Sequence, residues 1–245
     1  MDALTISAAS GLRARMETLD MLANNMANAS TGGFKLDREF YSLYVSPEAD
    51  GSAGTLTTVP LIEKHWTDFS QGTLTPTGNA TDLALSGKGF FAVSAPSGVL
   101  YTRNGSFRLS SKGVLVTPEG YPVQAQNLKF IQSNSNGPLQ VMRDGEVRQD
   151  GQTIGKLQLV DFPAEADIAK EGNNYFRPAD PKIKLTPAAA AQVEQGKLED
   201  SNVSPAESAV RLVSVMRQFE MLNRAVALGA DMNKRAIEEV ARVGS

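Results

Sequence analysis

The stretch "NNMANASTGGFK", Asn24–Lys35, marks the place where one kind of structure ends and another begins. Its asparagines lie at the end of a helical pattern, and Gly32 and Gly33 then stop that pattern. Asparagine is a poor helix former, tolerates left-handed backbone and can cap the last carbonyl groups of a helix. The stretch therefore predicts a helix end, after which the chain enters a different fold.

A helix is predicted before this stretch, between Thr5 and Ala29. Apolar residues recur there at a seven-residue spacing that Arg15 interrupts. They are Ala8, Leu12, Leu19, Leu22 and Met26. This spacing predicts a helix with one apolar stripe.

A second helix is predicted near the other end of the sequence, with a clear start. Ser204 is a candidate N-cap, Pro205 suits the first helical position, and Glu207 completes a capping box. Its apolar stripe is Leu212, Val215, Met216, Phe219, Leu222, Val226, Ala236, Ile237 and Val240. Isolated helices are only marginally stable in water, so both helices require a partner.

The chain between the helices has the pattern of an antiparallel sheet. From Thr81 to Val123, short apolar runs alternate with turn signals, and a second group follows from Val141 to Phe162. Asn104-Gly105 is the sharpest signal, because a type I′ turn needs positive φ at both positions. We therefore expect a hairpin at Asn104-Gly105.

These patterns predict an α+β fold, in which the two terminal helices form a coiled-coil domain around an inserted, mainly antiparallel β domain. The expected divisions are 1–35 for the first helix, 36–80 for extended chain and short strands, 81–181 for the β domain, 182–200 for a return linker and 201–245 for the second helix.

Composition argues against several classes of partner. The 24 Lys and Arg residues and 27 Asp and Glu residues give a net charge of −3, and no long basic run favours nucleic acid or an anionic membrane. The absence of cysteine excludes disulfides and thiolate chemistry. No apolar run reaches the ~18 residues of a membrane span, and the start lacks the pattern of a secretory signal. We expect no membrane insertion, and either a cytoplasmic protein or export without a cleaved signal.

Candidate sites for chemistry are few. His65 is the single histidine, which leaves little room for a histidine metal site or a catalytic triad. Gly87–Ala92 matches a dinucleotide fingerprint, but two phenylalanines in a strand pattern follow the glycines in place of a helix. Asp144, Glu146 and Asp150 do not have the spacing of a calcium loop. We therefore expect no catalytic, metal or cofactor site and no enzymatic activity.

Four blocks of the sequence, in order, resemble the bacterial flagellar rod and hook proteins. They are "LANNMANASTGGFK" (Leu22–Lys35), "QGTLTPTGNATDLALSGKGFFAV" (Gln71–Val93), "YTRNGSFRLSSKGVLVTPEGYPV" (Tyr101–Val123) and "LEDSNVSPAESAVRLVSVMRQFEM" (Leu198–Met221). Together they extend over nearly the whole chain, so the resemblance is far more specific than any one block.

The resemblance implies a structural subunit of the flagellar basal-body rod, which spans the periplasm. It implies helical polymers with the terminal helices packed as coiled coils in the inner wall, and a drive shaft that transmits torque to the hook. Other copies, other rod proteins and the flagellar type III export apparatus are the implied partners, and that export reads no cleaved signal. The length and the "RQFEM" wording are most similar to the proximal rod protein, and the distal rod protein is the alternative.

The expected assembly surface combines the two apolar stripes with the asparagines. Asn24 and Asn25 are predicted to use their amides on neighbouring subunits and Asn28 to cap the helix, although capping alone would also explain all three. The full set of predicted interface residues is Leu12, Leu19, Leu22, Asn24, Asn25, Met26, Asn28, Leu212, Val215, Met216, Phe219, Leu222 and Val226.

A binding module or hydrolase is the alternative from a different class of protein. In that case the terminal helices would pair within one soluble monomer, and the β domain would hold a concave site. Residues that could line such a site are His65, Trp66 and Asp82.

Overall fold

The computed structural model describes residues 3–45, 58–127, 129–135, 137–163 and 168–243. The chain divides into two compact units. The helical unit contains Met1–Ala27, Leu36–Asp68 and Ser204–Ser245, and the β unit contains Asn28–Lys35 and Phe69–Val203. The class is α+β with mainly antiparallel strands, as the sequence predicted.

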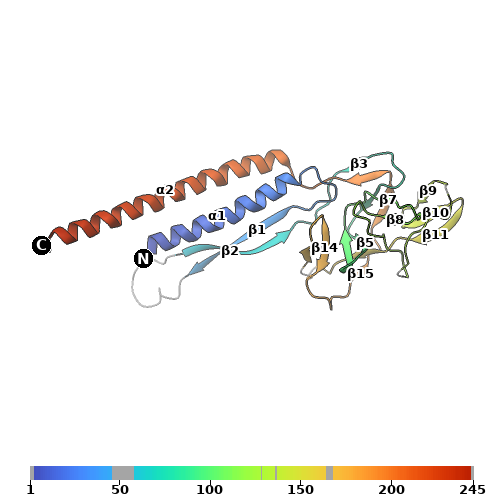
Figure 1. The fold of residues 1–245 in the computed structure, drawn as a ribbon, viewed down its shortest axis with the longest axis horizontal. Coiled ribbons are helices and arrows are strands. Elements are labelled where there is room, and N and C mark those ends of the chain that lie inside the picture. Colours follow the sequence, from blue (N-terminus) through green and yellow to red (C-terminus); the bar gives the residue numbers. More distant parts are fainter. Residues whose placement is uncertain (1–2, 46–57, 128, 136, 164–167, 244–245) are drawn as a thin grey trace. The chain divides into compact units, whose positions relative to one another are not determined.

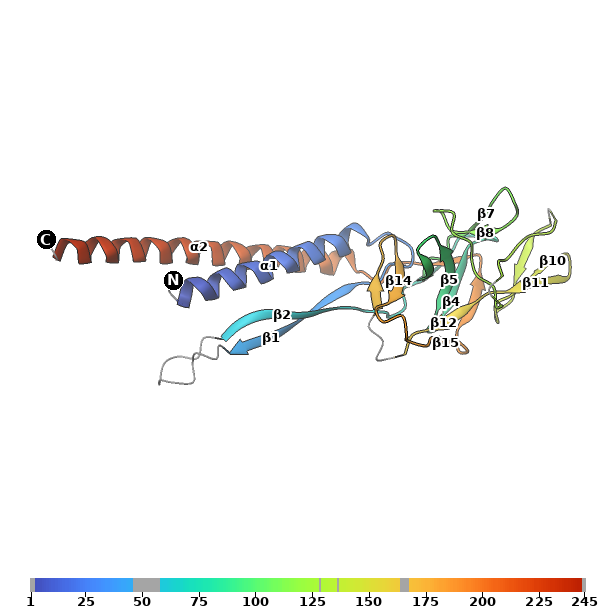
Figure 2. The ribbon, with the colours of Figure 1, turned by 60° about the horizontal axis from the view of Figure 1, so that its bottom comes forward.

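The helical unit consists of two helices and one β-hairpin (Figure 1). Its elements are α1 (Ala3–Ala27), β1 (Asp37–Val45), β2 (Thr58–Thr67) and α2 (Pro205–Val243). Strands β1 and β2 pair antiparallel, and α1 contacts both this hairpin and α2; α1 lies between them in Figure 1 and crosses α2 in the view of Figure 2. The long hairpin occupies part of the segment predicted as extended chain and short strands.

The predicted start of the second helix is confirmed. Helix α2 begins at Pro205, and the backbone N–H of Glu207 donates to Ser204 Oγ at 3.4 Å. The N–H of Ser208 donates to the Ser204 carbonyl, which makes Ser204 the N-cap.

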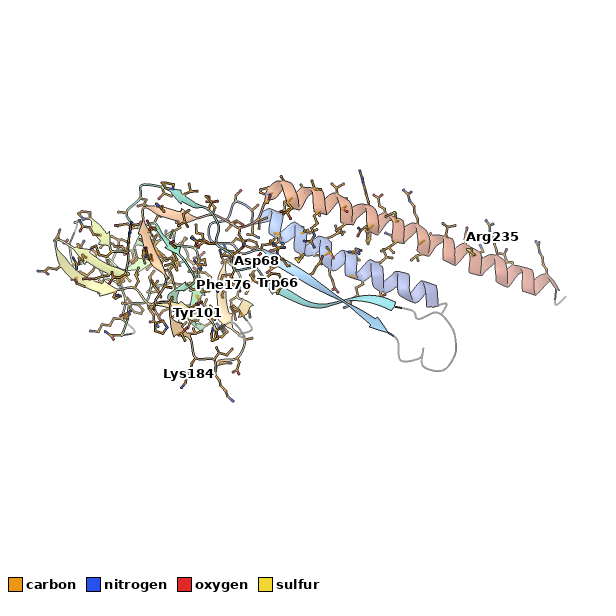
Figure 3. The ribbon with its side chains drawn as sticks, turned by 180° about the vertical axis from the view of Figure 1, so that it is seen from behind. Trp66, Asp68, Tyr101, Phe176, Lys184 and Arg235 are labelled. Carbon is orange, nitrogen blue, oxygen red and sulfur yellow. The ribbon has the colours of Figure 1, made fainter. Side chains whose placement is uncertain are left out.

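The two helices run antiparallel and differ in length. Met21 and Leu22 of α1 pack with Val215 of α2, and a methyl group added at Gly11 would lie 3.5 Å from Leu222. This register places the start of α1 level with about residue 230, so α2 continues for roughly 20 Å beyond it. Arg235 lies on that extension (Figure 3).

The β unit contains short strands in several small antiparallel sheets, the largest with the order β13-β14-β6-β5-β12-β15. Its strands are β3 (Leu74–Pro76), β4 (Leu83–Ser86), β5 (Phe90–Ala95), β6 (Gly98–Thr102), β7 (Arg108–Leu109), β8 (Leu115–Val116), β9 (Leu139–Val141), β10 (Glu146–Gln149), β11 (Gln152–Lys156), β12 (Leu159–Asp161), β13 (Ile168–Lys170), β14 (Tyr175–Pro178), β15 (Thr186–Pro187), β16 (Gln192–Gln195) and β17 (Lys197–Glu199). The segment 182–200, predicted as a return linker, thus contributes three strands.

Two apolar clusters fill the β unit. The larger contains fully buried residues such as Leu83, Phe91 and Val93, and Phe91 packs edge-on against Phe107. The smaller is aromatic and includes Phe90, Phe162 and Phe176, with Tyr101 packed against it (Figure 3). Burial of this apolar surface is the main favourable contribution to the stability of the unit.

The hairpin expected at Asn104-Gly105 is a wrong prediction. Neither residue has positive φ, so the backbone does not form a type I′ turn. Gly105 is instead required by close packing, because an added methyl group would lie 1.6 Å from the carbonyl oxygen of Leu83. Asn104 Oδ1 accepts a hydrogen bond from the N–H of Ser106. The dipeptide therefore lies where the chain passes close to the backbone of Leu83, and not at the tip of a hairpin.

The helices of the described residues include none that is both long enough and apolar enough to cross a membrane. The division into 1–35, 36–80, 81–181, 182–200 and 201–245 stays a prediction.

Candidate functional site

The asparagines that end α1 have different surroundings. Asn25 is fully buried, and its amide pairs in both directions with the backbone of Asp37. Asn25 Nδ2 donates to the Asp37 carbonyl at 2.9 Å, and the Asp37 N–H donates to Asn25 Oδ1 at 3.0 Å. The Asn25 side chain thus pairs with the Asp37 backbone as an adjacent strand would, and it fixes the start of β1 against the end of α1.

Asn28 and Asn24 differ from Asn25. Asn28 accepts the backbone N–H of Thr31 on its carbonyl and the Thr31 hydroxyl on Oδ1, in the turn after α1. Asn24 is exposed on the last turn of the helix. Asn25 therefore bonds within its own chain, Asn28 shapes the turn, and Asn24 lies at the surface of the last helical turn.

An ion pair joins α2 to the hairpin inside the helical unit. Arg211 donates to Glu39 at 3.2 Å, and the Glu39 side chain is almost completely buried. Because a buried carboxylate needs a partner, this contact and the Asn25 amide together hold β1 to both helices.

The inner faces of the helices repeat at alternating spacings of three and four residues. On α1 the buried positions are Gly11, Ala14, Thr18, Met21, Leu22 and Asn25. On α2 the buried and half-buried positions of the facing stripe are Ser208, Leu212, Val215, Phe219, Leu222, Val226 and Gly229. This is the spacing with which two helices pack along a seam.

The predicted interface residues divide between this seam and the surface. Leu22 and Val215 are buried, whereas Met26 and Met216 are exposed by 44% and 48%. The half-buried members of the predicted set are Leu12, Leu19, Asn28, Leu212, Phe219, Leu222 and Val226. The structure brings Leu19, Leu22, Leu212 and Val215 together in one cluster.

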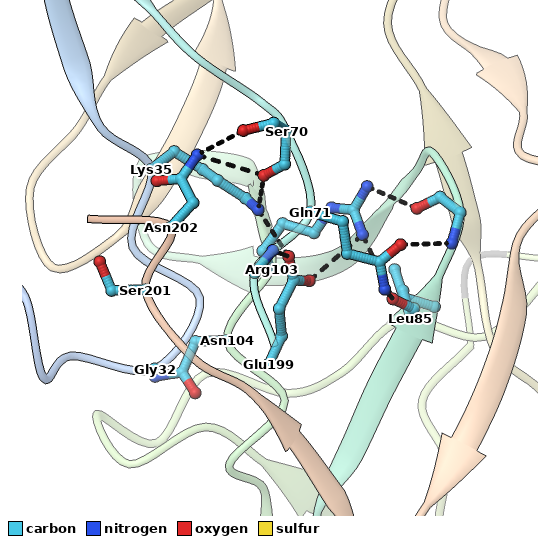
Figure 4. A network of polar contacts seen from close by, with 12 residues as sticks. Gly32, Lys35, Ser70, Gln71, Leu85, Arg103, Asn104, Glu199, Ser201 and Asn202 are labelled. Carbon is cyan, nitrogen blue, oxygen red and sulfur yellow. Dashed lines mark hydrogen bonds and ion pairs between the residues drawn. The ribbon is translucent and has the colours of Figure 1, made fainter. Parts of the chain in front are cut away.

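The β unit contains a buried cluster of three charged residues, Lys35, Arg103 and Glu199 (Figure 4), which we call the ionic cluster. Lys35 Nζ donates to Glu199 Oε1 at 2.5 Å, and Arg103 Nη1 donates to Glu199 Oε2 at 3.3 Å. The side chains of Lys35 and Glu199 have no exposed surface, and that of Arg103 is 3% exposed.

Backbone groups satisfy much of the remaining hydrogen-bonding capacity of the ionic cluster. Glu199 Oε1 also accepts the N–H of Gly72, and the Glu199 carbonyl accepts the N–H of Gly33 at 2.7 Å. Lys35 donates a second bond to the Ser70 carbonyl, also at 2.7 Å. Buried charges are tolerated when they are paired and hydrogen-bonded in this way.

Arg103 also contacts groups other than the carboxylate of Glu199. Its Nη2 donates to the carbonyl of Gly87 at 2.7 Å, and the guanidinium lies 5.3 Å from the centre of the Phe90 ring. Burial lowers the pKa of Arg103 below its usual value, and the nearby charge of Glu199 opposes this shift. The guanidinium stays charged at every physiological pH, because the usual pKa of arginine is so high.

The ionic cluster joins segments that are far apart in the sequence. Lys35 ends "STGGFK", Arg103 lies in "YTRNGSF", and Glu199 lies in "LEDSNV". All three segments belong to the blocks that resemble the flagellar rod and hook proteins, but their sequence pattern predicted no role for these three charges. No local pattern marks them, because Lys35 and Glu199 are 164 positions apart.

Residues considered for chemistry are not gathered into a site. The described residues contain no group of three or more His, Asp or Glu side chains placed to hold a metal ion. Trp66 belongs to the helical unit and Asp82 to the β unit, where Asp82 accepts a hydrogen bond from Asn79. The side chain of His65 lies outside the described residues. Strand β5 follows the glycines of Gly87–Ala92, as the sequence predicted, where the dinucleotide fingerprint requires a helix.

Known families match the ends and the centre of the chain. "Flagella basal body rod protein" matches residues 7–35, "Flagellar hook protein FlgE/F/G D1 domain" matches 84–153, and "Flagellar basal body rod FlgEFG protein C-terminal" matches 194–239. The flagellar basal-body rod protein FlgF of Caulobacter vibrioides is 35% identical over 231 residues, which are 92% of each chain. This chain belongs to the flagellar basal-body rod protein family.

Other relatives include both FlgF and FlgG proteins. FlgF of Mesorhizobium japonicum is 33% identical over 203 residues, which are 82% of this chain and 83% of that protein. FlgG of Buchnera aphidicola subsp. Schizaphis graminum is 32% identical over 241 residues, which are 88% of this chain and 91% of that protein. The family is structural and not enzymatic, and its location is the rod of the flagellar basal body.

Replacing Asn25 tests whether its amide fixes the start of β1. Asn25→Asp removes the Nδ2 donor and puts a carboxylate beside the Asp37 carbonyl, at a cost of about 1–3 kcal/mol. We expect the Asp37 amide to exchange its proton with solvent roughly tenfold faster or more. Hydrogen-exchange mass spectrometry or NMR measures this rate, with Asn24→Asp as the exposed control. Equal rates in the two variants would contradict the assigned role.

Replacing Glu199 tests the ionic cluster. Glu199→Gln leaves Lys35 and Arg103 as buried cations without a carboxylate, so we expect the free energy of unfolding of the β unit to fall by about 3–5 kcal/mol. Glu194→Gln is the matched control, because Glu194 pairs with Lys197 at the surface, where loss costs about 1 kcal/mol or less. Denaturant unfolding followed by circular dichroism measures both, and equal losses would refute the cluster's importance.

Proposed function

We propose that this rod protein polymerises helically through its terminal helices and forms part of the proximal drive shaft, which transmits torque to the hook. The observation that carries the proposal is that both helices have a second apolar face that no described residue of the same chain covers. Its partners are other copies of this chain and other rod proteins, and it reaches the rod through the flagellar type III export apparatus.

The second apolar face of α2 is strongly exposed. Val210, Met221, Leu228 and Met232 are 73%, 62%, 64% and 68% exposed. On the helix they lie roughly opposite Val215, which is buried against α1. A helix that is apolar on two opposite faces requires a partner on each side, and α1 supplies only one of them.

Helix α1 has a comparable second face. Met16 is 55% exposed and Met26 is 44% exposed, while Leu12 and Leu19 beside them are half-buried. Full burial of each such side chain contributes roughly 1.5–3 kcal/mol before the cost of ordering. Several contacts of this size support packing of the helices as coiled coils between subunits, in addition to the seam within one subunit.

The proximal position is favoured over the distal one by the length of the chain and its "RQFEM" wording, which are most similar to the proximal rod protein. Both positions share the same sequence blocks, so the distal rod is the second candidate. A soluble binding module is disfavoured, because soluble monomers rarely expose a group of large apolar side chains on one face, as Val210, Met221, Leu228 and Met232 are exposed here.

Deletion of this chain alone distinguishes the two rod positions. Electron cryotomography of basal bodies in deletion cells should show rods missing from the proximal segment outward. A proximal stub with only the distal portion lost would favour the distal assignment. Intact rods would contradict a role as a rod subunit.

A charge placed on the exposed face of α2 tests assembly through the helices. Met221→Glu should leave the monomer folded, because the side chain is exposed, but should prevent rod formation, because the carboxylate would be buried between subunits. Asn223→Glu, also exposed on α2 but on another side of the helix, is the control and should assemble. Circular dichroism reports folding, and complementation of the deletion with cryotomography reports assembly. Normal rods with Met221→Glu would contradict the proposal.

A further inference from the structure

The second apolar faces of α1 and α2, which we call the outer faces, differ from each other in charge as well as in position. This inference rests on the proposed assembly through the terminal helices and specifies which face meets which. We propose that the outer face of α1 in one copy docks on the outer face of α2 in a second copy, with Asp20 of the first copy paired to Arg217 of the second.

The outer face of α1 has the regularity of a helix seam. Its residues are spaced alternately by three and four positions, as the buried positions of the same helix are. They are Ala9, Leu12, Met16, Ala23 and Met26, together with Leu19 at the edge where this stripe meets the inner seam. All are exposed or half-buried, so a second helix can pack along this stripe without displacing α2.

The outer face of α2 offers a matching groove. Val210, Val213, Arg217 and Met221 line an open groove of about 590 Å³ on one side of the helix. The face continues along the helix through Leu228 to Met232. Methionine and leucine side chains of a second helix suit such a groove, because methionine adapts to irregular apolar surfaces.

Two unpaired charges mark the contact. Asp20 is exposed at the edge of the α1 stripe, four residues after Met16, and Arg217 lies in the α2 groove, between Val213 and Met221. Among the residues that the structure describes, neither forms an ion pair or a side-chain hydrogen bond. The nearest charged residues of α1, Arg13 and Glu17, pair with each other at 3.1 Å.

Opposite charges beside an apolar seam select the partner helix and its register. Asp20 is acidic and Arg217 is basic, so α1 of one copy and α2 of another are complementary. The same side of α2 also holds the exposed Glu220 and Arg224, so with Arg217 its charges are two positive and one negative, and a symmetric contact between two α2 faces would bring two net-positive surfaces together. Electrostatics therefore favours contact between unlike faces.

Contact between unlike faces has a consequence for assembly. Each copy presents its α1 face to one neighbour and its α2 face to another, so the contact is head-to-tail and does not close after two copies. Repetition of such a contact generates a ring or an open helix, whereas a symmetric contact would end at a dimer. The geometry of the faces thus accounts for polymer growth.

Charge reversal tests the pairing. Asp20→Arg and Arg217→Asp, each alone, are expected to raise the concentration at which the purified full-length chain assembles by about tenfold or more, and the double variant should restore assembly. Asn223→Asp, which adds the same charge on another side of α2, should assemble like the unchanged chain. Circular dichroism checks that every variant is folded.

Cross-linking tests which faces meet, because the chain contains no cysteine of its own. Asp20→Cys and Arg217→Cys are prepared separately, mixed, assembled and oxidised. A disulfide forms only where the two α-carbons approach to within about 7 Å. We expect cross-linked pairs that contain one of each variant. Cross-links of Arg217→Cys with itself, without mixed pairs, would overturn the proposal.

Failure of this inference is distinguishable from failure of the proposed function. If the charge reversals assemble normally while Met221→Glu does not, the Asp20–Arg217 pairing is wrong and assembly through the helices stands. If Met221→Glu assembles normally as well, both are wrong. Loss of assembly in each single charge variant with no recovery in the double variant would also refute the pairing.

Discussion

The buried carboxylate of Glu199 is the contact on which the β unit depends. It receives Lys35 and Arg103 together with the N–H of Gly72, so four distant segments of the chain meet at one side chain. An unpaired charge at such a site would be very unfavourable, so the segments are held at fixed positions relative to one another. Those segments continue along the chain into α1, β1 and α2, which begin or end only a few residues away.

Hydrogen bonds and an ion pair join the hairpin of the helical unit to its two helices, and apolar side chains stay exposed on those helices. Asn25 pairs with the backbone of Asp37, and Glu39 pairs with Arg211, so the hairpin is fixed to both helices. The seam around Leu22 and Val215 then joins the helices. Large apolar side chains such as Met16, Met221 and Leu228 stay exposed on the helices, as expected for a subunit that completes its packing in a polymer.

Local patterns in the sequence predicted the elements well and the long-range contacts poorly. The start of α2 follows from Ser204 and Pro205, because capping is a matter of a few adjacent residues. The hairpin at Asn104-Gly105 failed, because tertiary packing around Gly105 outweighed the turn preference. Lys35 and Glu199 carried no signal, since nothing local shows that charges 164 positions apart will meet. The family blocks could be recognised, but the reason for their charged residues required the structure.

The most direct test of this account is electron cryomicroscopy of a rod assembled from this chain, at a resolution that shows side chains. We expect Lys35, Arg103 and Glu199 to remain buried within one subunit and to touch no neighbour. We also expect neighbouring copies to cover the exposed faces around Met16 and Met221. Contacts between subunits through the ionic cluster, with both helix faces left exposed to solvent, would contradict it.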